Sequence, residues 1–308
     1  MRIKSNIDKK LRPEVSILTL NWNVDKMLEK CINSVIKNIN GISYEMVIID
    51  NNSMGQGFMR VKQNFSQYKN FTWIENDQNL GLVAFNHVLK YCKGRYLLLL
   101  APDVIIFPET IERMIHFLDN NTEAGAVTAK LLNPDGSPQN YYYKFWTISM
   151  CLLSTGAGKL FDKIIFNKRL SNHFFDKNVD SDNLTCVDQP AIACFLLRWD
   201  SVSSEYLIDE DFPFYFEDVD LCKRIYENGY KIFVLPQAEV CHFYSASFDK
   251  TDDGWRDEEF RRSAIKYFKK YHTWKVPVLK MIFLLEDMIR IFFSAILGKW
   301  RSKKKKNG

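Results

Sequence analysis

The sequence lacks the signatures of several common classes of protein. No CxxC pair occurs among its seven cysteines, so zinc-knuckle and disulfide scaffolds are not expected. GxGxxG, GxxxxGK(S/T), HExxH and GxSxG do not occur in a suitable context, which argues against dinucleotide-binding, P-loop, zincin and serine-hydrolase proteins. No apolar run precedes Val15, so no secretory signal is predicted, and the thiols are expected to be reduced in the cytoplasm.

Excess charge of one sign is scarce outside the C-terminal tail. Lys and Arg number 42 against 37 Asp and Glu, and most of the net charge of +5 comes from Lys303 to Lys306. Because the rest of the chain is nearly neutral, we expect no nucleic-acid partner. The 308 residues, 46% of them hydrophobic and 26% charged, suffice for one large folded domain or two small ones.

Strands and helices alternate over residues 15–132. Short aliphatic runs predict strands at 15–20, 46–49, 71–75, 95–100 and 126–132, and the segments between them predict helices at 25–38, 56–68, 82–92 and 108–119. This alternation predicts an α/β fold with a mostly parallel central sheet and helices on both faces. Residues 133–185 are less regular. Beyond them we predict an apolar run at 191–197, a helix at 218–228 and short strands at 231–235 and 239–243.

Two acids stand just beyond predicted strands. Asp50 follows the second strand and precedes two asparagines, and Asp103 stands beyond the fourth. Parallel sheets bind ligands at the carboxyl ends of their strands, so both carboxylates are well placed for function. Asp50 fits either an Asx turn or a contact with a base or ribose edge. Asp103 fits either a turn or a ligand for Mg²⁺ or Mn²⁺, and both alternatives stay open at this point.

The densest group of acids lies at the start of the helix predicted at 218–228. Glu217, Asp218 and Asp220 follow the aromatic run 214–216. The helix dipole accounts for two acids there, but three in an apolar setting repel one another, which raises a pKa toward the range of a general base. We therefore favour a catalytic role for this cluster. His242 lies at a strand end, where packing, metal ligation and a phosphate contact are all open.

Seven short motifs, in this order, resemble the family 2 glycosyltransferases of the GT-A fold. The resemblance runs from Val15 to Ser247 and is closest to the rhamnosyltransferase-like branch of bacterial polysaccharide biosynthesis. The motifs lie at 15–23, 50–53 (DNNS), 79–86 (NLG followed by Asn86), 98–103 (LLLAPD), 131–139 (LLNPDGSPQ), 209–224 and 236–247. The chain departs from the branch pattern at Ala101, Met54-Gly55, Ile192 and Leu207-Ile208.

The resemblance implies roles for particular residues. Asp218 matches the catalytic base of an inverting transfer, with Glu217 and Asp220 on the acceptor side. Asp103 and His242 match positions that hold a divalent cation, Mg²⁺ or Mn²⁺. The donor would be a dTDP- or UDP-linked sugar, rhamnose or another hexose. The residues implied to contact this nucleotide sugar are Asn21, Asp50, Asn52, Asn79, Gly81, Asn86 and Asp103.

The C-terminal segment has a different composition. Residues 276–298 are strongly apolar, but Lys280, Glu286, Asp287 and Arg290 interrupt them, which argues against a membrane-spanning helix. We predict an amphipathic helix on the membrane surface, aided by the basic tail, with 276–306 as the contact. Packing on the catalytic domain and a dimer interface remain alternatives. A membrane contact suits a glycan acceptor that is linked to lipid.

The predicted organisation has three parts. Residues 1–13 form a lead-in and 14–275 a GT-A glycosyltransferase domain, with a nucleotide-binding half at 14–132 and an acceptor-side half at 133–275. Residues 276–308 form the amphipathic helix and tail. Such an enzyme would be cytoplasmic and peripheral on the inner face of the cell membrane.

Two other functions compete with this prediction. A nucleotidyltransferase would need a basic triphosphate-binding loop near the first strand, and residues 18–24 contain no basic residue. A non-catalytic module that binds glycan or partners at the membrane would not need Asp103, Asp218 and His242.

Overall fold

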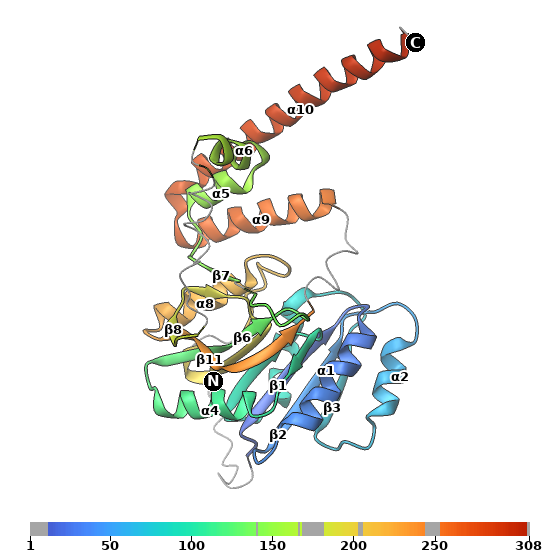
Figure 1. The fold of residues 1–308 in the computed structure, drawn as a ribbon, viewed down its shortest axis with the longest axis vertical. Coiled ribbons are helices and arrows are strands. Elements are labelled where there is room, and N and C mark those ends of the chain that lie inside the picture. The colour runs from blue at the N-terminus through green and yellow to red at the C-terminus, as the bar shows by residue number, and fades with distance from the viewer. Residues whose placement is uncertain are drawn as a thin grey trace.

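The computed structural model describes residues 12–139, 141–165, 167, 182–202, 206–243 and 253–306, with side chains in the last helix described to residue 292. Within these residues nine strands form one sheet in the order β3-β2-β1-β4-β10-β6-β11-β5, with β8 beside β11 (Figure 1). The strands are β1 (Val15–Asn21), β2 (Tyr44–Asp50), β3 (Phe71–Glu75), β4 (Tyr96–Leu100), β5 (Val104–Ile106), β6 (Ala124–Leu132), β8 (Thr185–Cys186), β10 (Cys194–Arg198) and β11 (Lys231–His242). Residues 1–11 of the predicted lead-in and Ser247 lie outside the described residues.

The parallel part of the sheet lies where the sequence predicts it. β1 pairs in parallel with both β2 and β4, and β2 pairs in parallel with β3. Asn21 lies opposite Asp50 in this register. Because β2 and β4 flank β1, the polar residues that follow the two strands lie at the same edge of the sheet.

Helices cover both faces of the sheet (Figure 1). One core cluster joins it to α1 (Asp25–Asn38), α2 (Gly57–Asn64) and α4 (Thr110–Asn120), and a second joins its other face to α3 (Ala84–Val88) and α8 (Glu217–Glu227). Ile17 belongs to the first cluster and its neighbour Leu18 to the second, as expected for a strand buried on both sides. The α/β prediction is confirmed.

Several elements differ from their predictions. β10 runs antiparallel to β4 and β6, so the sheet is mixed. β11 is one strand, where two were predicted; its register shifts between Leu235 and Glu239, beside Pro236, which has no N–H to donate to the sheet. The helix predicted at 82–92 is α3 between two 3₁₀ turns, at 81–83 and 89–91.

A third core cluster lies beside the start of α8 and carries the C-terminal helices. It joins α8 to α5 (Ile148–Ser154), α9 (Asp253–Tyr271) and α10 (Val276–Lys306). Leu279 and Phe283 of α10 are buried in it with Phe216 and Tyr267. α6 (Gly156–Ile165) follows α5 in the stretch predicted to be irregular. Among the described helices, none is both long enough and apolar enough to cross a bilayer.

Candidate active site

The loop after β2 is held to the end of β1 by side chains. The Asn21 amide donates to Asp50 Oδ1 at 2.8 Å and to Ser53 Oγ at 3.1 Å, and the Ser53 N–H donates to Asp50 Oδ2 at 2.9 Å. Asp50 therefore closes the turn after β2 by accepting from the backbone three residues on, one position further than in the predicted Asx turn, and its contact with a base or ribose edge stays a prediction. Asn21 is fully buried, so it orients Asp50 and the loop from within.

Asn51, which the sequence analysis did not single out, joins the loops after β2 and β3. Its amide donates to Asn79 Oδ1 and to the Gly81 carbonyl, both at 3.0 Å. Gly81 has a φ of 58°, and a Cβ there would lie 1.7 Å from the carbonyl oxygen of Pro213, so only glycine fits. Asn52 instead is exposed, in the left-handed region with a φ of 60°.

Asn86 is held by the backbone of residues 207 and 208. Its Oδ1 accepts from the N–H groups of Leu207 and Ile208 at 3.0 Å, and its Nδ2 donates to the Ile208 carbonyl at 2.7 Å. These contacts describe a positioning residue. A direct contact with the nucleotide sugar stays a prediction.

Asp103 and His242 lie together because β5 and β11 pair. His242 is opposite Val104 in that antiparallel ladder, and the Phe243 N–H donates to the Asp103 carbonyl at 2.9 Å. As a result His242 Nε2 lies 3.5 Å from Asp103 Oδ1, and both side chains are nearly buried. The two predicted metal ligands are thus neighbours in space although 139 positions separate them in the chain.

Gln139 sets the orientation of the imidazole. Its Nε2 donates to the His242 carbonyl, a group that can only accept, so its Oε1 faces His242 Nδ1 at 2.9 Å. Nδ1 therefore carries a proton, and Nε2 is the ring nitrogen that faces Asp103. A carboxylate and an imidazole nitrogen suit Mn²⁺, whose remaining ligands would come from diphosphate oxygens and water. No cluster of three or more His, Cys, Asp or Glu side chains suited to a metal occurs in the described part of the chain.

Glu217 and Asp218 begin α8 behind a strained residue. Phe216 has a φ of 68°, unfavourable for a side chain of that size, and is held by its burial in the third core cluster. Burial raises the pKa of Glu217 to about 8, with the Asp218 charge as a second cause. Burial also raises the pKa of Asp218, against hydrogen bonds from the Val219 N–H and from Gln189. This is the direction that a general base needs.

Unpaired polar atoms surround this acidic pair. Gln189 donates to Asp218 Oδ2 at 2.8 Å, but its own Oε1 and Glu217 Oε2 are buried with no hydrogen-bond partner among the described residues. Buried polar groups are rarely left unpaired, so these two acceptor atoms single out the start of α8 as a candidate site. Gln189 lies on β9 (Gln189–Pro190), which pairs with β7 (Tyr142–Tyr143) in a separate small sheet.

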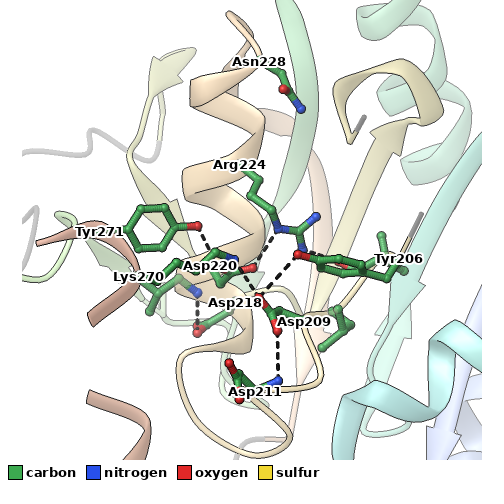
Figure 2. A network of polar contacts seen from close by, with 12 residues as sticks. Tyr206, Asp209, Asp211, Asp218, Asp220, Arg224, Asn228, Lys270 and Tyr271 are labelled. Carbon is green, nitrogen blue, oxygen red and sulfur yellow. Dashed lines mark hydrogen bonds and ion pairs between the residues drawn. The ribbon is translucent and has the colours of Figure 1, made fainter. Parts of the chain in front are cut away.

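Asp220 has a different position from the one predicted. The side chain is fully buried, and Oδ2 accepts from Arg224 Nε at 2.7 Å. Oδ1 accepts from Lys270 Nζ at 2.5 Å and from the Tyr271 hydroxyl at 2.7 Å (Figure 2). Lys270 also pairs with Asp209 at 2.7 Å. We therefore replace the predicted acceptor contact of Asp220 with a positioning role that ties α8 to α9.

The residues missed at this site share one property. Asn51, Gln139, Gln189 and Lys270 are polar, and each acts on a predicted site residue or its loop from a distant part of the chain. Gln139 ends a motif on which the family resemblance rests, which was the signal available for it. Lys270 had no such signal in the sequence, since lysines at helix ends are common.

Comparison with known proteins gives the family. Residues 16–180 match the family model described as glycosyl transferase family 2. The chain is 27% identical over 116 residues to the minor teichoic acid biosynthesis protein GgaB of Bacillus subtilis (strain 168), which covers 37% of this chain and 13% of GgaB. It is 23% identical over 269 residues to the uncharacterized protein y4gI of Sinorhizobium fredii, which covers 85% of this chain and 28% of y4gI. The chain thus spans a minor part of these relatives.

Solved structures show the fold. S. aureus TarS 1–349 has a TM-score of 0.51 at 16% identity, over 85% of this chain and 74% of that one. GalNAc-T7 with UDP, GalNAc and Mn²⁺ has a TM-score of 0.54 at 15% identity, over 77% and 45%. TarS 1–349 in complex with UDP-GlcNAc has a TM-score of 0.53 at 17% identity, over 83% and 66%. These likenesses confirm the predicted GT-A fold. Because the family model spans more than half of the residues, the chain belongs to glycosyl transferase family 2.

Proposed function

We propose that the protein transfers a sugar from a nucleoside diphosphate sugar to a hydroxyl group of a glycan acceptor, with inversion at the anomeric carbon. The observation that carries this function is the pair Asp103 and His242, 3.5 Å apart, where β5 and β11 meet. The loops after β2 and β3, which include Asp50 and Asn79, are the proposed nucleotide side. The acidic pair at the start of α8 is the proposed acceptor side.

The proposed donor is a UDP- or dTDP-linked hexose, with rhamnose included through the resemblance of the motifs. The structural neighbours solved with UDP-GlcNAc and with UDP, GalNAc and Mn²⁺ support a uridine nucleotide. Asp103 and His242 would hold Mg²⁺ or Mn²⁺. A bound cation would offset the charge of the departing diphosphate.

Asp218 is the proposed general base. Its carboxylate accepts the proton of the acceptor hydroxyl while that oxygen forms a bond to the anomeric carbon, and the bond from that carbon to the diphosphate oxygen breaks. The nucleoside diphosphate leaves with the bonding electron pair, and the proton later passes from Asp218 to solvent. The hydrogen bond that Gln189 donates to Asp218 orients its carboxylate. The raised pKa of Asp218 makes this carboxylate a stronger base.

The proposed acceptor is a glycan linked to lipid at the inner face of the cell membrane. The relative GgaB is named for minor teichoic acid biosynthesis, which supports a cell-surface polymer as the acceptor. Residues 276–306 are the proposed membrane contact, and 14–132 and 133–275 the proposed nucleotide and acceptor halves of the catalytic domain. α10 exposes large apolar side chains such as Leu284 and Met288, which supports this contact.

Thermal unfolding of the purified protein tests the donor site. UDP, dTDP, GDP and CMP are each added with and without Mn²⁺. A ligand at a hundred times its dissociation constant stabilises the folded state by about 2.7 kcal/mol, a readily measured shift. We expect UDP or dTDP to raise the unfolding temperature, and to do so more strongly with Mn²⁺.

Variants and turnover complete the test. Asp103→Asn should remove the contribution of Mn²⁺, and Asp200→Asn, at an exposed acid that follows β10 on the opposite edge of the sheet, should not. Nucleoside diphosphate release is then measured with UDP-GlcNAc, UDP-GalNAc and dTDP-rhamnose. If no nucleotide shifts the unfolding temperature with or without metal, the transferase function is wrong and the non-catalytic binding module takes its place.

A further inference from the structure

α6 and α10 direct acids inward and apolar side chains outward. On α6, Asp162 is buried, while Leu160 and Ile164 are 57% and 68% exposed. On α10, Glu286 is buried, while Leu284 is 60% exposed. A helix packed on a soluble domain normally shows the opposite pattern.

A polar network on the inner side holds α10 in this orientation. Glu286 accepts from Arg261 of α9 at 2.7 Å and from Arg290 at 3.0 Å. Asp287 accepts from the same Arg261 at 2.7 Å, and Arg290 donates to Asp257 of α9 at 2.7 Å. The polar stripe of α10, formed by Glu286, Asp287 and Arg290, therefore pairs with side chains of α9. The apolar face of α10 is left on the outside.

The same network places α6 beside α10. Glu286 Oε1 also accepts from the N–H of Gly156, the first residue of α6, at 3.1 Å, and Figure 1 shows α6 against the lower part of α10. Most of the large apolar side chains that are exposed in the described residues lie here. They are Leu152, Leu160, Phe161, Ile164 and Ile165 on α5 and α6, and Trp274, Val278, Met281, Leu284, Leu285, Met288, Ile289, Ile291 and Phe292 on α10 and the turn before it.

Charged side chains beside this apolar surface indicate what kind of partner covers it. Lys159 and Lys163 of α6 and Lys280 of α10 are exposed beside the apolar residues, and the sequence of α10 ends in Lys303 to Lys306. Lysine is depleted at the core of protein interfaces, whereas lysine beside exposed leucine and phenylalanine is typical of helices that lie on anionic lipid.

We propose that α6 and α10 together form a two-helix platform that inserts its apolar side chains into the surface of an anionic bilayer. This deepens the membrane contact proposed above for 276–306 by adding α6 and by fixing which face of α10 meets the lipid. The platform also adjoins the proposed base. Phe216 and Val219 flank Glu217 and Asp218 and share the third core cluster with Leu279 and Phe283 of α10, so the bilayer would lie near the acceptor side.

Co-sedimentation of the full chain with vesicles tests the platform. Vesicles of phosphatidylcholine alone are compared with vesicles that also contain phosphatidylglycerol. Leu160→Gln/Ile164→Gln removes apolar area from α6 without adding charge, Leu284→Gln does so on α10, and Met59→Gln, 51% exposed on α2, is the matched control. We expect the α6 and α10 variants each to lose at least about tenfold in partition to the anionic vesicles, with the control unchanged.

Other outcomes overturn the proposal. Wild-type binding by the α6 variant would remove α6 from the platform, and equal binding to neutral vesicles would remove the anionic preference. Dimers by light scattering that dissociate in Leu160→Gln/Ile164→Gln, with no vesicle binding by the wild type, would show a second copy as the occupant. The nucleotide and Mn²⁺ shift in unfolding temperature is measured in parallel. If the wild type binds vesicles but shows no shift in unfolding temperature with nucleotide and Mn²⁺, the transferase function is wrong and the proposed platform is unaffected.

Discussion

Asp218 illustrates how single residues acquire their chemistry here. It stands two positions after Phe216, whose left-handed backbone is held by the third core cluster, and it accepts a hydrogen bond from Gln189 on another element. Burial raises its pKa. A strained backbone two residues away, a polar partner and a shifted pKa occur together at functional sites.

Replacing Asp218 should abolish turnover and spare the donor site. We expect Asp218→Asn to lower kcat by about 10²–10⁴-fold, the usual contribution of a general base. The shift in unfolding temperature with nucleotide and Mn²⁺ should persist. Asp211→Asn, an exposed acid that precedes α8, is the control and should keep its activity. Undiminished turnover in Asp218→Asn would show that another group is the base.

Gln139 should act on metal affinity through His242. Gln139→Met removes the acceptor that holds Nδ1–H, so we expect Mn²⁺ affinity in the presence of UDP to fall about tenfold, as for other partners of metal-ligating histidines. The affinity is measured by titration of the Mn²⁺ paramagnetic resonance signal. Gln139→Glu keeps an acceptor for Nδ1–H and should retain more of it. Gln63→Met, at an exposed position of α2, should have no effect on Mn²⁺ affinity. Equal losses of Mn²⁺ affinity in both Gln139 variants would contradict the positioning role of Gln139.

Glu217 should make stability depend on pH. Burial raises its pKa from an ordinary 4.5 to about 8, so the folded protein holds a proton there that the unfolded chain has lost. Stability from this group is complete below about pH 4.5 and falls as the pH rises toward 8. We expect Glu217→Gln to unfold much like the wild type at about pH 5 and to gain about 3–5 kcal/mol over it at about pH 9 in urea. Parallel stability curves for the two proteins would contradict the shift.

At the scale of elements, one buried carboxylate couples two helices. Asp220 of α8 is bound by Arg224 of the same helix and by Lys270 and Tyr271 of α9 (Figure 2). Two of these partners are cations, and Asp209 shares Lys270. A buried charge is tolerated only with such partners, so the network determines where α9 docks.

Two lysines one turn apart on α9 allow the buried ion pair with Asp220 to be compared with an ion pair at the surface. Lys270→Met removes a charged partner from a fully buried Asp220, and we expect a loss of about 1.5–3 kcal/mol in the free energy of unfolding. Lys266→Met breaks a pair with the exposed Asp211 and should cost less than about 1 kcal/mol. Urea unfolding of both variants measures the difference. Equal effects would mean that Lys270 also acts mainly at the surface.

At the scale of the whole molecule, α10 has two parts with different environments. Leu279, Phe283 and Glu286 face the protein, and most other described side chains of the helix are exposed. The first part thus completes the third core cluster, which contains Phe216 and Val219 on either side of Glu217 and Asp218. The rest extends away from the domain (Figure 1).

Two truncations test this division. Ending the chain after residue 292 keeps all three inward residues, so the unfolding temperature should stay within about 2 °C of the wild type while partition to anionic vesicles falls. Ending it after residue 275 removes two buried apolar side chains and should cost about 3–6 kcal/mol in the free energy of unfolding. A stable, active protein ending at 275 would show that α10 is dispensable for the core.

The fold of residues 15–132 was predictable from local patterns because the strands there are continuous apolar runs and the helices carry one apolar face. β1, α1 and β3 lie where the sequence places them. α5 and α6 were missed because their boundaries depend on tertiary contacts. Gly158 passes so close to Leu152 that a Cβ would lie 1.9 Å from its carbonyl oxygen, and the N–H of Gly156 is satisfied by Glu286 from a distant helix.

The sequence by itself determined which polar residues gather at the sheet edge, because acids and amides that follow buried parallel strands converge there whatever the rest of the chain does. The strand pattern alone placed Asp50 and Asp103 at that edge, while their proposed roles as nucleotide and metal contacts stay predictions. Only the tertiary structure decided that Asp220 is interior, that Gln139 orients His242, and that the polar stripe of α10 faces α9 and leaves its apolar face outside. Each of these depends on a partner far away in the chain. Burial and hydrogen bonding are set by where the backbone brings such partners, which local periodicity does not encode.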